Sequence, residues 1–181
     1  MYLQGFKKNT QQSANLAYFC KMNARTKIKS PRRTLNILLA DDDPDDCLFF
    51  KEALDELPLS VHLTTVHNGE QLMEQLTQKQ SKLPHVLFLD LNMPRKNGFA
   101  ALLEIKLNEK LQKIPVVIFS TSSDPDMLNL VYKDAAHYYI RKPAEFSQLK
   151  NVILQALTLI SQKNRSLPGK ENFVLTGDSS G

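Results

Sequence analysis

The chain has 181 residues, of which 42% are hydrophobic and 23% charged, so its composition is that of a globular protein of about one domain. It contains no apolar run of the roughly 20 residues that a membrane helix requires, and no apolar core of a secretory signal near its start. Its two cysteines, Cys20 and Cys47, provide neither a disulfide framework nor a zinc motif, so a reducing cytoplasm is the expected compartment.

The net charge of +4 is unevenly distributed along the chain. Residues 1–34 contain eight Lys or Arg residues and no acidic residue, whereas the remainder contains 15 basic and 19 acidic residues. We interpret residues 1–34 as a basic extension without stable structure, because its apolar residues follow no sustained period. A nucleic-acid or membrane contact, or a transit peptide, is the alternative. Met22 leaves open that residues 1–21 are not part of the native protein.

The first predicted element is LNILLA (residues 35–40), a continuous apolar run typical of a buried strand. The acidic segment DDDPDD follows, in which Asp43 is suited to cap a helix and Pro44 to occupy its first position. Apolar residues then recur at helical spacing. Because acids favour the start of a helix, we interpret Asp43, Asp45 and Asp46 as serving that purpose.

Four more pairs of a strand and a helix are expected after this one. Residues 59–65 alternate in polarity, as in a half-exposed strand, and Asn68-Gly69 begins the next helix. The later elements are expected at 85–90, 98–107, 115–120, from 124 onward, at 136–140 and at 144–162. Residues 164–181 are expected to form a tail.

Five alternating strands and helices predict a parallel sheet with helices on both faces. The strand at 59–65 is less apolar than the others, so it belongs at an edge of the sheet. The strand order 2-1-3-4-5 meets this condition and keeps the crossovers right-handed. The expected fold is therefore α/β, a flavodoxin-like doubly wound (βα)5 three-layer sandwich with a five-stranded parallel sheet, over residues 35–163.

The carboxyl ends of parallel strands share one rim of the sheet, where ligands bind near the switch in strand order. Asp41 and Asp42 follow the first strand, Asp90 the third and Lys142 the fifth, while Ser120 ends the fourth. Crowded carboxylates repel one another, so we expect a divalent cation that prefers oxygen ligands, Mg²⁺, between them. Asp90 is the candidate nucleophile for a phosphoryl group, which Ser120 and Lys142 would contact.

Four segments, LLADDDPDD, LFLDLNMPRKNG, IPVVIFSTSS and YYIRKP, occur in this order and resemble the response-regulator receiver domains of two-component signalling, the CheY-like superfamily. The resemblance covers about residues 35–160. The spacing of LNEKLQKIPVVIFSTSSDPD is further similar to stand-alone receivers of the bacterial phytochrome type. The resemblance implies that Asp90 is phosphorylated by a phosphohistidine on a partner sensor histidine kinase.

By position, the resemblance also implies how the metal is held. Asp42 and Asp90 would bind Mg²⁺ directly, Asn92 would contribute its backbone carbonyl, and Asp41 would act indirectly as the second member of an acidic pair.

The resemblance assigns a conformational switch to Ser120 and Tyr139. On phosphorylation, Ser120 would move toward the phosphoryl group and Tyr139 would turn inward. The pair Lys142-Pro143 implies a cis peptide bond at that point.

These observations predict a phosphoacceptor that assists its own phosphorylation and dephosphorylation, rather than an enzyme acting on other substrates. Its output would be a protein contact or onward transfer to a histidine phosphotransfer protein. No DNA-binding effector domain is expected, since fewer than 25 residues follow the last helix, and neither DNA nor a membrane is an expected partner.

Three other functions are less well supported by the sequence. A phosphohydrolase of the haloacid-dehalogenase type would need a second Asp where Asn92 stands. A degenerate receiver that serves only as an interaction module would not need every phosphoryl-contacting residue. An FMN carrier would need a Ser/Thr/Gly-rich phosphate loop in place of ADDDPDD, which would repel phosphate.

The last predicted helix, 144–162, carries more apolar residues than a single stripe requires, among them Val152, Leu154 and Leu159. The strand at 136–140 is expected beside it at the other edge of the sheet. A symmetric homodimer through this strand and helix would bury the surplus. The alternative is a monomer with a somewhat apolar helix.

Overall fold

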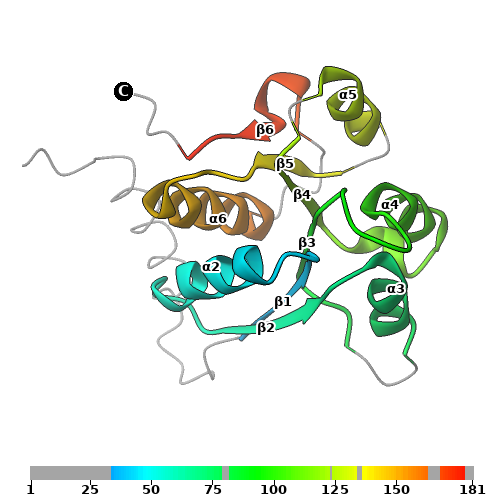
Figure 1. Cartoon of the computed structure of the whole chain (residues 1–181), viewed down its shortest axis with the longest axis horizontal. Helices are drawn as coiled ribbons and strands as arrows, with labels where there is room; N and C mark the ends of the chain where they lie inside the picture. The colour runs from blue at the N-terminus through cyan, green and yellow to red at the C-terminus, as the bar shows by residue number, and fades with distance from the viewer. Residues whose placement is uncertain (1–33, 79–81, 123, 134–135, 163–167, 178–181) are drawn as a thin grey trace, which may run out of the picture.

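A parallel sheet of six strands forms the centre of the computed structural model, in the order β2-β1-β3-β4-β5-β6 (Figure 1). The structure describes residues 34–78, 82–122, 124–133, 136–162 and 168–177. The strands are β1 (Leu35–Ala40), β2 (Val61–Val66), β3 (Val86–Leu89), β4 (Val116–Ser120), β5 (Tyr138–Arg141) and β6 (Val174–Leu175). The helices are α2 (Pro44–Asp55), α3 (Gly69–Thr77), α4 (Gly98–Leu107), α5 (Pro125–Lys133) and α6 (Phe146–Ser161), with 3₁₀ turns η1 (Leu111–Lys113) and η2 (Lys170–Asn172).

Helices α2 and α6 cover one face of the sheet, and α3, α4 and α5 cover the other (Figure 1). Strand residues alternate between the two resulting cores: Leu38 packs on the side of α3 and α4, and Leu39 on the side of α2 and α6. The central strands β3 and β4 are buried throughout, whereas β2 at the edge is mostly half-exposed. The predicted flavodoxin-like fold and the order of the first five strands are confirmed.

The expected number of strands is wrong, because a sixth strand lies beside β5. Val174 and Leu175 pair in parallel with Tyr139 and Ile140, within the segment that the sequence suggested was a tail. The side chains of Phe173 and Leu175 are buried. A strand of two residues is too short to show a period of two, so its sequence carries no recognisable pattern. The proposed basic extension, in contrast, lies almost wholly outside the described residues.

Most of the predicted surplus of exposed apolar surface at β5 and the last helix is covered. Strand β6 covers the edge of β5, and Val152 and Leu154 of α6 are buried, whereas Leu159 is half-buried. The homodimer through this face stays a prediction with less support from the structure than the sequence suggested. None of the described helices, α6 included, is long and apolar enough to cross a membrane.

Side-chain caps fix where three helices begin. Asp43 accepts a hydrogen bond from the backbone N–H of Asp45 (2.8 Å), as expected for the predicted cap of α2. Asn68 caps α3, and Asn97 caps α4 by accepting from the N–H of Ala100 (2.8 Å). All three caps lie at the carboxyl end of the sheet, so they hold the loops that carry the candidate residues.

At the opposite end of the sheet, His137 joins β5 to β4. Its backbone N–H donates to the carbonyl of Val116 (2.7 Å), and its ring Nδ1 accepts from the N–H of Val116 (3.2 Å). Nδ1 can accept only in the neutral ring. Burial, together with the nearby charge of Lys106, lowers the pKa of His137 to about 4.

Replacing His137 with Asn is expected to reduce the loss of stability on acidification. The folded-state pKa of His137 lies below its ordinary value of 6.5, so the unfolded chain binds this proton more readily and stability falls as the pH drops from 6.5 toward 4. The contribution lost between pH 7.5 and 5 is about 2 kcal/mol. Urea unfolding of both proteins at both pH values measures it. Asn keeps a hydrogen-bond acceptor but does not titrate. The other titratable groups are the same in both proteins, so their effects cancel when the two pH dependences are compared. An equal pH dependence of stability in the two proteins would contradict the prediction.

Candidate functional site

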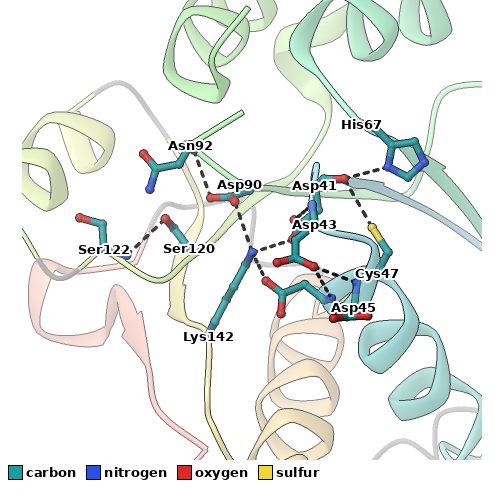
Figure 2. A network of polar contacts seen from close by, with 11 residues as sticks. Asp41, Asp43, Asp45, Cys47, His67, Asp90, Asn92, Ser120, Ser122 and Lys142 are labelled. Carbon is teal, nitrogen blue, oxygen red and sulfur yellow. Dashed lines mark hydrogen bonds and ion pairs between the residues drawn. The ribbon is translucent and has the colours of Figure 1, made fainter. Parts of the chain in front are cut away.

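Three carboxylates, those of Asp41, Asp42 and Asp90, meet at the carboxyl end of the sheet, and Figure 2 shows two of them, Asp41 and Asp90. Asp41 and Asp42 follow β1, and Asp90 follows β3, the neighbouring strand. One carboxylate oxygen from each of them lies within 4.8 Å of the others. Asp41 and Asp90 are buried, whereas Asp42 is exposed. The topology thus brings together the acids that the sequence places on this rim.

Lys142, which follows β5, points into this group of acids (Figure 2). Its Nζ lies 2.8 Å from Oδ2 of Asp41, 2.7 Å from Oδ2 of Asp46 and 3.2 Å from Oδ2 of Asp90. Burial alone lowers the pKa of Lys142, but its hydrogen bonds to Asp41 and Asp46 and the nearby carboxylate charges outweigh burial and raise the pKa overall. Lys142 therefore carries a positive charge that links three segments of the rim.

Asp46 is a member of this group that the sequence analysis missed. Interpreted as an acid that favours the start of α2, it instead pairs with Lys142, 96 residues away in the chain. Side chains on a helix lean toward its N-terminus, so an acid in the first turn of α2 overhangs the rim. This helix geometry could have indicated from the sequence that Asp46 lies at the rim. Asp43, in contrast, serves as the predicted cap of α2.

Asp41 has one well-satisfied oxygen and one that is not. Its Oδ1 accepts a hydrogen bond from the N–H of Asp43 (3.1 Å). Its buried Oδ2 lies 2.8 Å from Nζ of Lys142 and has no further partner among the described residues. Burial raises the pKa of Asp41 to about 6, although the hydrogen bond and charge of Lys142 oppose this shift.

The donor set fits a divalent cation. Asp41, Asp42 and Asp90 offer only oxygen ligands, which Mg²⁺, Ca²⁺ and Mn²⁺ prefer. The unsatisfied Oδ2 of Asp41 is buried among them. Among the described residues, Lys142 is the ammonium that pairs with Asp41, Asp46 and Asp90, and Asp42 adds a fourth carboxylate nearby, so the group gains from additional positive charge.

The loop after β3 holds Asp90 in place. The backbone N–H of Asp90 donates to the carbonyl of Ala40 (2.8 Å), and Oδ1 of Asp90 accepts from the N–H of Asn92 (3.2 Å). The loop returns at Gly98, whose N–H donates to the carbonyl of Leu91 (3.0 Å). A Cβ at position 98 would overlap the backbone oxygen of Asp90, so only glycine fits there. The Asn97-Gly98 pair therefore shapes the loop that carries Asp90.

The proposed switch residues lie beside this site, and neither of their side chains forms a hydrogen bond with Asp90. Ser120 is buried, and its Oγ accepts from the N–H of Ser122 (3.4 Å). Tyr139 is 1% exposed, and its hydroxyl donates to the carbonyl of Ser122 (2.6 Å). Burial raises the pKa of Tyr139, although hydrogen bonds with Ser120 and Ser122 oppose the rise. Tyr139 is thus already turned inward.

The implied cis peptide bond between Lys142 and Pro143 is not present. The described part of the chain contains no cis peptide bond, so this expectation is wrong for the structure.

The chain is similar in sequence to a known protein family. The response regulator receiver domain family matches residues 37–154. The chain is 31% identical to response regulator Rcp1 of Synechocystis sp. over 121 residues, which are 65% of this chain and 82% of Rcp1.

Two solved structures are similar over nearly their whole length. The phosphorylated cyanobacterial phytochrome response regulator RcpA is 32% identical with a TM-score of 0.65, covering 75% of this chain and 99% of RcpA. The Mn²⁺-bound form of Rcp1 is 29% identical with a TM-score of 0.64 and the same coverage, 75% and 99%. These similarities confirm the predicted resemblance to receivers of the phytochrome response-regulator type.

Proposed function

Because the chain belongs to the response regulator receiver domain family, we propose that it accepts a phosphoryl group on Asp90 and transmits a signal through the resulting change in conformation. The observation that carries this proposal is the setting of the Asp90 carboxylate. It ends a buried strand, is 6% exposed at the rim, and has Lys142 within 3.2 Å and two further acids beside it. Such a carboxylate is held in one orientation yet can be reached by a donor.

The chemistry follows from the contacts of Asp90. One carboxylate oxygen attacks the phosphorus atom of a phosphohistidine, so that a P–O bond forms while the P–N bond breaks and the imidazole leaves with the electron pair. The N–H of Asn92 contacts Oδ1 and keeps the carboxylate from rotating. The ammonium of Lys142, already beside Oδ2, then faces the added phosphoryl oxygens and offsets their charge.

Asp42, Asp90 and the backbone carbonyl of Asn92 would hold the divalent cation, with Asp41 acting indirectly, and we propose that this cation is Mg²⁺. When bound, it supplies positive charge to the acids and to the phosphoryl oxygens. The family and the Mn²⁺-bound form of Rcp1 support a divalent ion at such a site. Mg²⁺ is our choice because it binds through one or two carboxylates and shares phosphate oxygens.

Asp42→Ala is expected to weaken Mg²⁺ binding at least about tenfold, whereas Asp45→Ala changes it less than about twofold. Both residues are exposed acids at the start of α2, but only Asp42 has an oxygen within 4.8 Å of Asp41 and Asp90. Calorimetric titration with Mg²⁺ measures the difference. Similar losses in the two variants would show that the cation binds elsewhere.

The donor in this proposal is a sensor histidine kinase, the kind of partner that receivers have. The output is a contact with a downstream protein, or onward transfer to a histidine phosphotransfer protein, in the cytoplasm. The chain is not an enzyme with a separate substrate: it assists its own phosphorylation, and the loss of the phosphoryl group, at Asp90.

Incubation with phosphoramidate, a small donor with a P–N bond, tests the proposal. In the presence of Mg²⁺, intact mass spectrometry is expected to show one added phosphoryl group per chain, and excess chelator is expected to prevent it. No addition under either condition, with the protein folded, would contradict the proposed function.

A further inference from the structure

The C-terminal strap, residues 168–177, runs along β5 and places an aromatic side chain inside the molecule (Figure 1). Phe173 is 2% exposed and belongs to the same apolar core as Tyr139 and Val131. Its ring stands edge-on to Tyr132 of α5, with centroids 5.1 Å apart, and its centroid is 6.3 Å from that of Tyr139. Phe173 therefore fills the space between α5 and β5.

Tyr139 is held from two directions. Its hydroxyl donates to the carbonyl of Ser122 in the loop after β4 (2.6 Å), which ties it toward the rim that carries Asp90. Its backbone N–H donates to the carbonyl of Phe173 (2.9 Å), which ties it to the strap. The ring of Phe173 packs beside the ring of Tyr139. Tyr139 is thus the residue through which the strap and the loop after β4 meet.

We propose that Phe173 is a positioning residue for Tyr139 and couples the C-terminal strap to the state of Asp90. Phe173 and β6 occupy the volume next to the Tyr139 ring, so they block an outward turn of the ring in their direction. A docked strap therefore favours the inward Tyr139. The proposal rests on the proposed function, in which a phosphoryl group on Asp90 favours that same inward arrangement.

The strap contacts Tyr139 directly, but few contacts hold the strap to the rest of the molecule. Its strand has two residues, and its buried side chains are Phe173 and Leu175. A hollow of about 270 Å³ lies where α5 meets the strap, lined by residues that include Leu128, Phe173 and Val174. An element held by so few contacts detaches at lower cost than a core strand does.

Docking of the strap and binding of a phosphoryl group both favour the inward Tyr139, so each must raise the equilibrium constant of the other by the same factor. Docking of the strap is expected to raise the affinity of the site for a phosphoryl group, and the phosphoryl group is expected to tighten the strap. Couplings of this kind commonly amount to about 5- to 150-fold.

The first test compares the binding of beryllofluoride, a phosphoryl mimic, with Mg²⁺ present. Phe173→Ala is expected to lower the affinity about tenfold and Phe173→Leu to restore most of it, since leucine refills the space. Val174→Ala, at the next residue of the strap but 40% exposed, is the matched control and is expected to bind as the wild type does. Affinity for Mg²⁺ alone is expected to stay unchanged in all three variants. An equal beryllofluoride affinity for the wild type and Phe173→Ala overturns the proposal.

The second test uses the wild-type chain and does not depend on the folding of a variant. Hydrogen exchange of the Tyr139 amide, whose acceptor is the carbonyl of Phe173, is expected to slow about tenfold when beryllofluoride binds. An unchanged exchange rate overturns the coupling even if Phe173→Ala does not fold. A wild type that binds no beryllofluoride and accepts no phosphoryl group would instead refute the proposed function itself.

Discussion

Phosphoryl transfer to the Asp90→Asn variant is expected to fall below detection, while the variant stays folded. The amide has nearly the shape of the carboxylate but no anionic oxygen to attack phosphorus. Its stability is not expected to drop, because Lys142 keeps its partners Asp41 and Asp46, and one of the crowded negative charges is removed. Intact mass spectrometry after incubation with acetyl phosphate and Mg²⁺ measures the uptake.

Asp45→Asn is the matched control for this experiment. It is also an acid at the rim-facing end of the molecule, but it is exposed on α2 and outside the group of carboxylate oxygens that includes Asp41, Asp42 and Asp90. Uptake by Asp45→Asn is expected to equal that of the wild type. Uptake by Asp90→Asn at the wild-type rate would show that another residue is the acceptor.

Lys142→Met is expected to lower the free energy of unfolding by about 3 kcal/mol at pH 7.5 with a chelator present. The Lys142 side chain is 8% exposed and lies within 3.2 Å of three carboxylates, so its removal leaves their charges without compensation in a buried site. Urea unfolding measures the change. Mg²⁺ is expected to stabilise the variant more than the wild type, because it supplies the missing positive charge.

Lys51→Met is the comparison for the loss of a single ion pair. Lys51 pairs with Asp55 at 2.7 Å on the surface of α2, where both side chains are 60% exposed. Such pairs contribute little to stability, because water screens both charges. Equal losses in the two variants would mean that Lys142 acts as an ordinary surface residue.

Most of the fold was predictable because it depends on patterns that recur along the chain. The apolar runs that became β1, β3 and β4 mark buried parallel strands, and the caps Asp43, Asn68 and Asn97 mark where helices begin. Strand β6 was not predictable from these patterns. It consists of two residues, and its position depends on where Phe173 finds space between α5 and β5, which only the assembled sheet determines.

The site was predictable in its outline but not in all its contacts. Strand ends in a parallel sheet must share a rim, so Asp41, Asp90 and Lys142 could be placed together from topology alone. The contact between Lys142 and Asp46 depends on how the lysine side chain crosses the rim, which the order of strands does not specify. The packing of Tyr139 beside Phe173 was likewise not predictable, because it depends on the unpredicted position of the strap.

The most direct test of the proposed function is to locate the phosphoryl group in the wild-type chain. Acyl phosphates are reduced by borohydride, so a phosphorylated aspartate is converted to homoserine, which peptide mass spectrometry can identify. After treatment with phosphoramidate and Mg²⁺, the conversion is expected at Asp90 and nowhere else. Conversion at Asp41, Asp42 or another acid, or a phosphoryl group carried by a histidine, would contradict the assignment of Asp90 as the acceptor.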